Sequence, residues 1–255
     1  MLKKIALASA LAVSASFATY DYFPVGEAGH GQAEIKVGYN WHDDWSQMII
    51  GLGAKYNVIP NLELSIFNLG YQLWSEDKDY CDQKGVDCDT DGLYAFTFGA
   101  RYQFMPMLIA ALDVQIPLSS DDVTGDYDPF GLYAAIQYTQ EFIPGLALGS
   151  ELGFDWKFED ENREEGLRMN ILAELDYTIA SIGVTPWIGI EFDKKLTENK
   201  LDGKDVGGDD SELSFWIGAL YDINQMFTVK ANFIIANGDL DGDYMGISGV
   251  LDINF

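Results

Sequence analysis

The sequence predicts an all-β protein, a closed antiparallel transmembrane β-barrel of about 12 strands with short periplasmic turns and long acidic extracellular loops. Three observations favour this fold. A turn phrase recurs along the 255-residue chain, the segments between the turns alternate apolar and polar residues, and aromatic residues gather near the ends of these segments. Membrane-spanning barrels combine these features, because alternate side chains of each strand face lipid and lumen.

The recurrent phrase marks one end of each hairpin. It reads YNVIPNLEL at 56–64, YQFMPMLIA at 102–110 and QEFIPGLAL at 140–148, and degenerate copies read YTIASIGVT at 177–185 and YDINQMFTV at 221–229. Each copy ends one alternating run and begins the next, which is typical of a tight hairpin turn. The turn centres carry no charge, whereas the connections at the opposite end are acidic.

Twelve runs alternate with the period of a strand. They cover about 31–41, 45–58, 61–74, 92–104, 107–118, 130–142, 145–158, 167–179, 182–194, 212–223, 226–237 and 244–255. The third run changes phase. Leu62, Leu64 and Ile66 share one apolar face, which Phe67, Leu69, Tyr71 and Leu73 then continue, so we expect a β-bulge near Ile66–Phe67.

The segments before the first run have separate roles. Residues 1–18 combine two lysines, a short apolar stretch and small residues before the expected cut, which predicts a signal peptide. Residues 19–30 are expected to form a periplasmic N-terminal segment or a plug, and residues 31–255 form the barrel. An even number of strands places both ends of the barrel on the turn side.

Aromatic residues predict two girdles at the membrane interfaces. Tyr56, Phe104, Phe142, Tyr177, Tyr221 and Phe255 fall on the turn side, and Trp41, Trp45, Trp74, Trp156, Phe158, Phe192 and Phe215 fall on the loop side. A water-soluble β-sandwich also alternates, but it needs neither the girdles nor the contrast between uncharged turns and acidic loops.

The charge pattern bears on the lumen and on partners. A formal net charge of −26 excludes nucleic acid, which needs clustered Lys and Arg. The inward phase predicts a lumen richer in acids than in bases, and the expected charge-selective wall comprises Glu151, Asp155, Glu174, Asp176, Glu191, Asp193, Arg101, Arg168 and Lys55. Such a wall either is merely solvated and mutually paired, or favours cations and polar solutes.

Other reactive residue types are few. Cys81 and Cys88 share one polar loop of an exported chain and predict a disulfide. His42 beside two aspartates is either an exposed turn or a base or weak metal site. The loop with Asp239, Asp241 and Asp243 is at most a weak metal site, because it lacks the closing glutamate of a calcium loop. We expect no cofactor and no enzyme activity, with loops that bind divalent cations diffusely and bridge to lipopolysaccharide.

The C-terminal segment GVLDINF, with Leu251, Ile253 and Phe255 in phase, resembles the assembly signal of Gram-negative outer-membrane barrels. The resemblance implies recognition of this strand by the barrel-assembly machinery and a location among outer-membrane lipid and lipopolysaccharide. The stretches FPVGEAGHGQAEIKVGY and GLGAKYNVIPNLELSI are similar to an outer-membrane transporter family linked to degradation of aromatic compounds.

These observations predict a porin-like channel for passive diffusion of small polar or cationic solutes through an acidic lumen. The alternative is a plugged barrel with a structural or surface-interaction role and no transport. A barrel of twelve strands has a backbone diameter of roughly 25 Å, between filled barrels of eight strands and open porins of sixteen. Inward glycines add room, so a water-filled passage is expected.

Overall fold

The computed structural model describes residues 22–76, 89–94, 96–120, 127–207, 210–240 and 242–255. Within these ranges no helix has the length and apolar character needed to cross a membrane. The expected signal peptide, at 1–18, lies outside the described residues, as do Cys81, Cys88 and Asp241.

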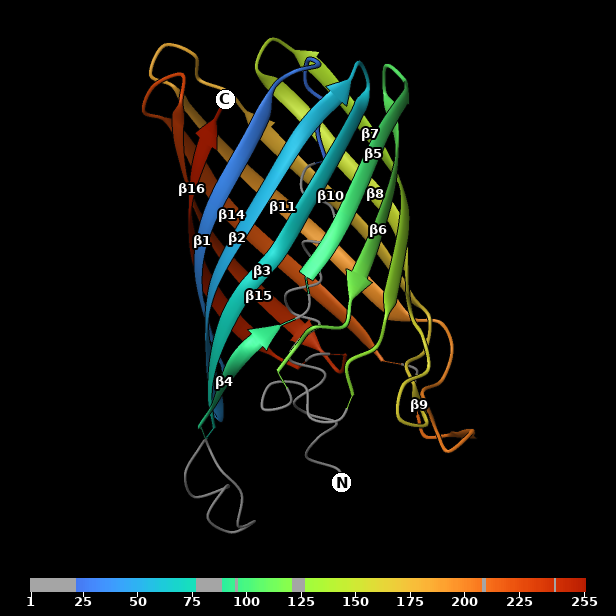
Figure 1. Cartoon of the computed structure of the whole chain (residues 1–255). Coiled ribbons are helices and arrows are strands. Elements are labelled where there is room, and N and C mark those ends of the chain that lie inside the picture. The colour runs from blue at the N-terminus through green and yellow to red at the C-terminus, as the bar shows by residue number, and fades with distance from the viewer. Residues whose placement is uncertain (1–21, 77–88, 95, 121–126, 208–209, 241) are drawn as a thin grey trace.

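Antiparallel strands close into a barrel (Figure 1). The wall consists of β1 (Gly31–Trp41), β2 (Trp45–Ile59), β3 (Leu62–Glu76), β4 (Asp89–Tyr94), β5 (Phe96–Met105), β6 (Leu108–Ile116), β7 (Gly131–Ile143), β8 (Leu146–Lys157), β10 (Arg168–Tyr177), β11 (Val184–Lys195), β14 (Ser211–Asp222), β15 (Phe227–Gly238) and β16 (Tyr244–Asn254). Strand β1 pairs with both β2 and β16, which closes the sheet as a barrel in hydrocarbon requires, and β4 extends the wall by pairing with β3. The twelve predicted runs are confirmed, with β4 and β5 together in the place of the fourth.

The three proline turns share one construction. Pro60, Pro106 and Pro144 each begin a two-residue connection, and the strand before each has a register shift two to three residues earlier. Gly145 adopts φ 86°, and a Cβ there would lie 2.6 Å from the Thr178 carbonyl oxygen. A side chain at this position would therefore strain the turn and collide with the neighbouring hairpin. Figure 1 shows these turns and the C-terminus at one end of the barrel and the long loops at the other.

The predicted phase change in β3 exists, but it lies slightly later in the strand. The pairing moves from Leu52 with Leu69 to Ala54 with Ile66, so one extra residue lies between them on β3. Asn68, at φ 60°, takes the left-handed conformation that Asn tolerates. The expectation that Phe67 continues the outer face is wrong. Phe67 is 3% exposed and points into the barrel, because the extra residue reverses the phase after Phe67 rather than before it.

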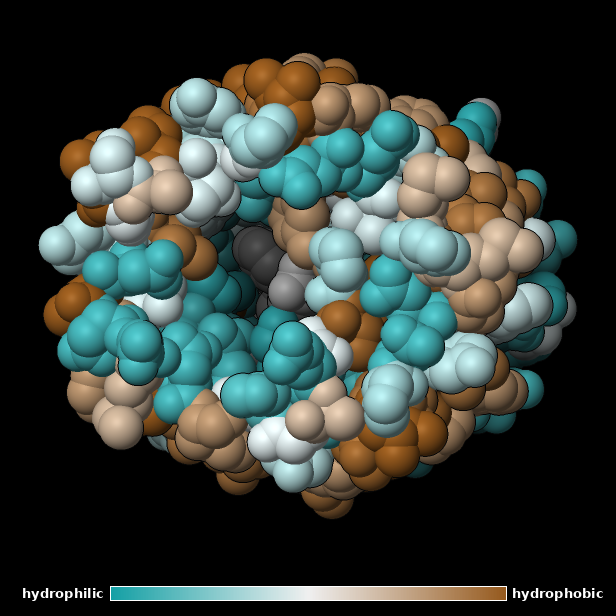
Figure 2. Space-filling view, turned by 90° about the horizontal axis from the view of Figure 1, so that it is seen from above, coloured by the Kyte–Doolittle hydropathy of each residue, from teal (hydrophilic) through white to brown (hydrophobic). Residues whose placement is uncertain are grey.

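Apolar side chains cover the outside of the barrel. Most of the long apolar side chains that were expected to meet lipid are exposed in the isolated chain, and these include all six turn-side aromatics of the predicted girdle. Figure 2, viewed from the turn end, shows apolar residues around the outer rim and polar residues around the opening. The loop-side girdle is wrong at Trp45 and Trp74. Trp74 is buried because the bulge places it on the inner face, and Trp45, in phase with the buried Gln47, stacks on it with ring centroids 4.6 Å apart.

The position of Ile217 in the outer belt gives a direct test of this orientation. Ile217 is 57% exposed, lies near the middle of β14 and pairs with the equally exposed Ile188. We expect Ile217→Arg to lower the free energy of unfolding from bilayers by about 2–4 kcal/mol, the cost of an arginine near the midplane. Chemical denaturation in lipid vesicles measures it, with Ile217→Leu as the control. Equal stability of the two variants would contradict the assignment of this face to lipid.

A second sheet forms outside the barrel wall, at the loop end. It joins β9 (Arg163–Glu164), β12 (Lys200–Leu201) and β13 (Lys204–Asp205). The Lys200 Nζ lies 2.9 Å from the Glu164 Oε2 across the pair β9–β12. The two loops after β8 and β11 therefore pack on each other. This arrangement was not predicted, because two-residue strands leave no periodic signal in the sequence.

Candidate functional site

A belt of polar side chains runs around the inner wall from β2 to β11. Its first part is charged: the Arg101 Nη1 lies 3.0 Å from the Glu63 Oε1, and the Lys55 Nζ lies 3.9 Å from the other oxygen of Glu63. Arg101 and Glu63 are each only 2% exposed. Arg101 Nε also donates a hydrogen bond of 3.0 Å to the Gln137 Oε1. The guanidinium thus has one acceptor on β3 and one on β7, and such partners are what a buried charge requires.

The second part of the belt carries neutral groups between carboxylates. Gln137 Nε2 donates to Glu151 at 2.8 Å, and the Tyr133 hydroxyl donates to the same carboxylate. Asn170 Nδ2 then donates to Glu191 and, at 3.1 Å, to Asp193. Two acids that face the same side of β11 therefore share one amide donor. Hydrogen bonds engage these carboxylates, so they are less available to a passing solute than their positions in the sequence imply.

The segment before β1 lies inside the barrel at the turn end. The Phe23 carbonyl oxygen accepts a hydrogen bond from Arg101, and Val25 N donates to the Gln103 Oε1 at 3.0 Å. Tyr22 packs on β8, where a Cβ at Gly149 would lie 2.7 Å from the Tyr22 Cβ. Gly29 N donates to the Asn57 carbonyl oxygen at 2.8 Å. Residues 22–30 thus extend from β2 across to β5 and β8, contacting the inner wall on each.

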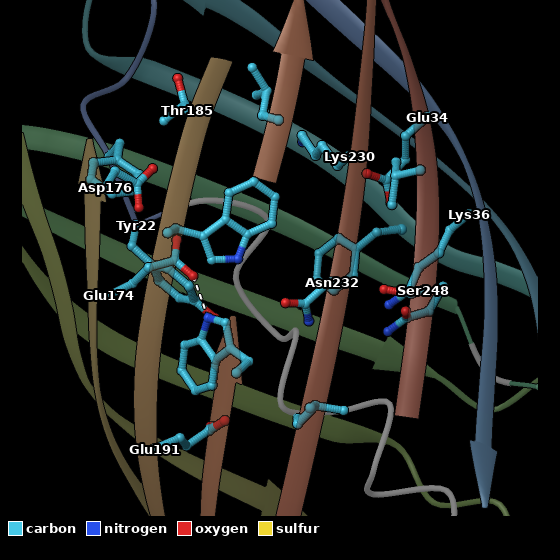
Figure 3. Close-up of a pocket in the computed structure, with 18 residues that line it drawn as sticks. Tyr22, Glu34, Lys36, Glu174, Asp176, Thr185, Glu191, Lys230, Asn232 and Ser248 are labelled. Carbon is cyan, nitrogen blue, oxygen red and sulfur yellow. Dashed lines mark hydrogen bonds between the residues drawn. The ribbon is translucent and has the colours of Figure 1, made fainter. Parts of the chain in front are cut away.

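A cavity of about 310 Å³ occupies the part of the lumen that the belt leaves open (Figure 3). Strands β10, β11, β14, β15, β16, β1 and β3 form its wall, and Tyr22 and Phe23 also line it. The lining residues are Tyr22, Phe23, Glu34, Lys36, Phe67, Asn68, Glu174, Asp176, Thr185, Trp187, Glu191, Trp216, Leu220, Lys230, Asn232, Ile234, Ser248 and Val250. Four carboxylates and two ammonium groups give the lining a formal charge of −2.

Charges in this cavity are separated across the lumen. Figure 3 shows Glu174, Asp176 and Glu191 on one side and Glu34, Lys36 and Lys230 on the other. The Lys230 Nζ lies 2.8 Å from the Asp252 Oδ2, so its charge is compensated by an adjacent acid. Glu34 lies two residues from Lys36 on the same face of β1. The excess negative charge therefore lies on β10 and β11.

Two tryptophans lie against glycines on the wall of the cavity. Trp187 of β11 pairs in register with Gly218 of β14, and Trp216 of β14 pairs with Gly189 of β11. A Cβ at either glycine would overlap the indole opposite it. Each ring therefore occupies the space that a side chain would fill. Trp216 Nε1 also donates a hydrogen bond to Glu174, which fixes the orientation of its ring (Figure 3).

The predicted wall residues fall into distinct groups in the structure. Glu174 and Asp176 line the cavity, and Glu191 belongs to both the cavity and the belt. Arg101, Lys55, Glu151 and Asp193 belong to the belt. Asp155 lies 3.6 Å from the Lys157 Nζ, and Arg168, at the loop end of β10, lies 3.8 Å from Glu165. The sequence therefore predicted which charged residues face the lumen, but it did not separate the residues bonded within the belt from those that line the cavity.

Sequence reasoning missed the neutral members of this interior. Tyr133, Gln137 and Asn170 complete the belt, and Trp187 and Trp216 form the aromatic wall. A usable signal was present for the tryptophans, because each has an inward glycine two residues away on its own strand. The spacing alone does not show that each tryptophan lies opposite a glycine, because this also depends on the register of β11 with β14.

The loop end holds further charged residues. The Arg163 Cζ lies 4.3 Å from the centre of the Tyr127 ring, and burial raises the pKa of the Tyr127 phenol. Burial also raises the pKa of Asp128, with the nearby Asp160 adding to it. His42 accepts a hydrogen bond of 3.3 Å from Asp44 N and stacks on Trp45. Among described residues no group of three or more His, Cys, Asp and Glu can hold a metal ion; Asp243 instead accepts from Gly238 N.

Comparisons with known proteins agree with this architecture. The family model described as "Putative MetA-pathway of phenol degradation" matches residues 23–239. An outer-membrane channel from Pseudomonas putida F1 is similar in structure, with a TM-score of 0.78 and 14% identity over 91% of this chain and 98% of that one. A search of curated proteins by sequence gave no match.

Two further solved structures share the barrel. The CymD monoaromatic hydrocarbon channel has a TM-score of 0.52 and 9% identity over 90% of this chain and 88% of that one. The translocator domain of the autotransporter NalP from Neisseria meningitidis has a TM-score of 0.57 and 12% identity over 99% of this chain and 97% of that one. At these identities the likeness establishes the fold, which is that of Gram-negative outer-membrane barrels.

Proposed function

The chain belongs to the MetA-pathway phenol-degradation family and is a barrel of the bacterial outer membrane, and from this premise we propose that it is a channel for small polar or cationic solutes. The observation that carries the proposal is the cavity inside the barrel, whose lining has four carboxylates and two lysines. Passive diffusion through this cavity requires no catalytic residue.

The proposed path runs between the loop end and the turn end on the side of β10, β11 and β14. A second cavity, of about 360 Å³, lies at the turn end. Its lining residues are Pro24, Gly26, His30, Gly31, Gln32, Lys55, Asn57, Glu63, Gln225, Asn254 and Phe255. The segment 22–30 contributes to the walls of both cavities. We therefore assign it the role of a plug that narrows the passage, with the charge preference set by Glu174, Asp176 and Glu191.

Neutralising two of these acids tests the selectivity. In Glu174→Gln/Asp176→Asn the cavity lining keeps two carboxylates and two lysines, so its formal charge falls to zero. We expect the cation preference to disappear, with the reversal potential in a salt gradient across a planar bilayer close to zero. Both substitutions preserve side-chain size, so the width of the passage changes little. Work at about 0.1 M salt keeps the Debye length near 10 Å, comparable with the lumen.

A charge-matched control separates the cavity from the loops. Glu161→Gln/Asp239→Asn removes the same charge from exposed positions at the loop end. This variant should keep the reversal potential of the unmodified protein within a few millivolts. If both double variants shifted the potential equally, the cavity acids would not set the selectivity.

The second candidate, a plugged barrel without transport, has one observation in its favour. Residues 22–30 cross the turn end of the lumen and are bonded to β2 and β5. Electrically silent insertion of correctly folded protein into bilayers would support this candidate over the channel.

A further inference from the structure

The two indoles on the cavity wall present an aromatic surface to the lumen. Trp187 and Trp216 pack against Gly218 and Gly189, and both line the cavity. Trp216 is only 9% exposed, because Leu172, Ile234 and Tyr244 pack around it, so the less buried Trp187 supplies the larger part of the indole surface that faces the cavity. Tyr22 and Phe23 of the N-terminal segment add two further rings on the same side of the cavity as Gly149. The occupant that this surface favours has a flat or apolar part.

Each tryptophan has a carboxylate beside it. Glu174 accepts the hydrogen bond from Trp216 Nε1, and Asp176 is the partner of Trp187 in the pairing of β10 with β11. An aromatic face attracts a cation, more strongly when water is excluded, and a neighbouring carboxylate adds to the attraction. The combination of ring and acid, present twice, favours an organic cation over a neutral or anionic solute.

The opposite wall offers hydrogen-bond acceptors and does not favour anions. Asn232 lies in the same cross-strand row as Asp176, Trp187 and Gly218, and in the described part of the chain its buried Oδ1 accepts no hydrogen bond. Lys230, one row away, is within 2.8 Å of Asp252. The Asn232 amide can accept from an incoming ammonium group once its side chain turns toward the cavity, whereas an incoming carboxylate meets a lysine already paired with an acid.

We propose that this cavity binds small aromatic ammonium ions, with the ring against Trp187, beside Trp216, and the ammonium group toward Glu174, Asp176 and Asn232. The inference rests on the proposed function, since it names the class of solute that the channel selects. The volume of about 310 Å³ is at the lower end of small-molecule sites, which fits a single aromatic ring with a short side chain.

Three probes of nearly equal size test the chemistry. Benzylammonium is cationic at pH 7, benzyl alcohol is neutral and benzoate is anionic. Calorimetric titration of the full barrel in detergent at low salt should show benzylammonium binding at least about tenfold more tightly than the other two, the ratio that 1.4 kcal/mol of charge recognition gives. Equal affinity for benzylammonium and benzyl alcohol would overturn the proposal.

Variants locate the bound probe. Asp176→Asn, which keeps the packing of the wall, should weaken benzylammonium binding about tenfold and leave benzyl alcohol unaffected. Trp187→Leu should weaken the binding of benzylammonium and of benzyl alcohol, and Trp187→Phe should restore part of the loss. The control Trp156→Leu removes a tryptophan that is 49% exposed on the outer surface, and it should change none of the affinities. Undiminished benzylammonium binding by Asp176→Asn and Trp187→Leu would place the probe elsewhere and refute the site.

Conductance separates this inference from the proposed function. A barrel that conducts with a cation preference but does not bind benzylammonium contradicts the binding site alone. A barrel that binds benzylammonium with the expected variant pattern and conducts no ions contradicts the channel and leaves the binding site standing. When both hold, benzylammonium should reduce the ionic current in the unmodified protein and not in Asp176→Asn at the same concentration.

Discussion

Deletion of residues 22–29 is expected to raise the single-channel conductance at least about twofold, because a twelve-stranded barrel without a plug has room for a wider aqueous passage. The segment contributes to the walls of both cavities, and it contacts β2, β5 and β8 at the turn end. We expect its removal to join the two cavities along the lumen. Planar-bilayer recordings of the refolded deletion variant measure the effect.

Two variants show whether bulk or attachment matters. Tyr22→Ala/Phe23→Ala keeps the backbone contacts to β2 and β5 and removes two rings from the cavity wall, so we expect a smaller increase in conductance than the deletion gives. Gln103→Leu removes the acceptor for Val25 N but does not change the length or composition of the segment. The less firmly attached segment should add current fluctuations without abolishing conduction. Conductance identical in the deletion variant and the unmodified protein would show that the segment does not restrict the passage.

The sequence was sufficient for the barrel because period-two alternation reports which face a residue takes. It placed twelve strands, their turns and the outer surface, since these depend on local chain geometry and on lipid around the whole circumference. It failed at Phe67, where a single left-handed residue at Asn68 decides the phase. It also missed β9, β12 and β13, whose pairing depends on contact between two loops distant in sequence.

The candidate site was predictable only in part, for a related reason. Alternation says that Glu174, Glu151 and Arg101 face inward, but not which side chains lie side by side around the wall. That depends on the stagger between strands, which is fixed by turn geometry and bulges. The separation of Glu151, in the belt, from Glu174, in the cavity, follows from such cross-strand neighbours. The tryptophan–glycine pairs likewise exist only in the register of β11 with β14.

Arg101→Met is expected to destabilise the barrel by about 3–5 kcal/mol, the cost of leaving a buried carboxylate without its ion-pair partner. Glu63 is 2% exposed, and its nearest remaining cation, the Lys55 Nζ, lies 3.9 Å away. Gln137 loses its donor as well. Denaturant unfolding in lipid vesicles measures the change, with Arg163→Met as the control, because Arg163 is more exposed and lies in the small sheet at the loop end.

The double variant Arg101→Met/Glu63→Met separates the charge from the packing. Removing both partners eliminates the uncompensated carboxylate, so the double variant should be more stable than Arg101→Met although it has lost more native contacts. A double variant less stable than Arg101→Met would show that packing of the arginine stem, rather than its charge, supports the wall. Arg101 also donates to the Phe23 carbonyl oxygen, so both variants should loosen the segment and increase the conductance. If the stability falls while the conductance stays constant, the segment is held mainly by β2 and the Gln103 contact. One arginine would then support the wall without controlling the passage.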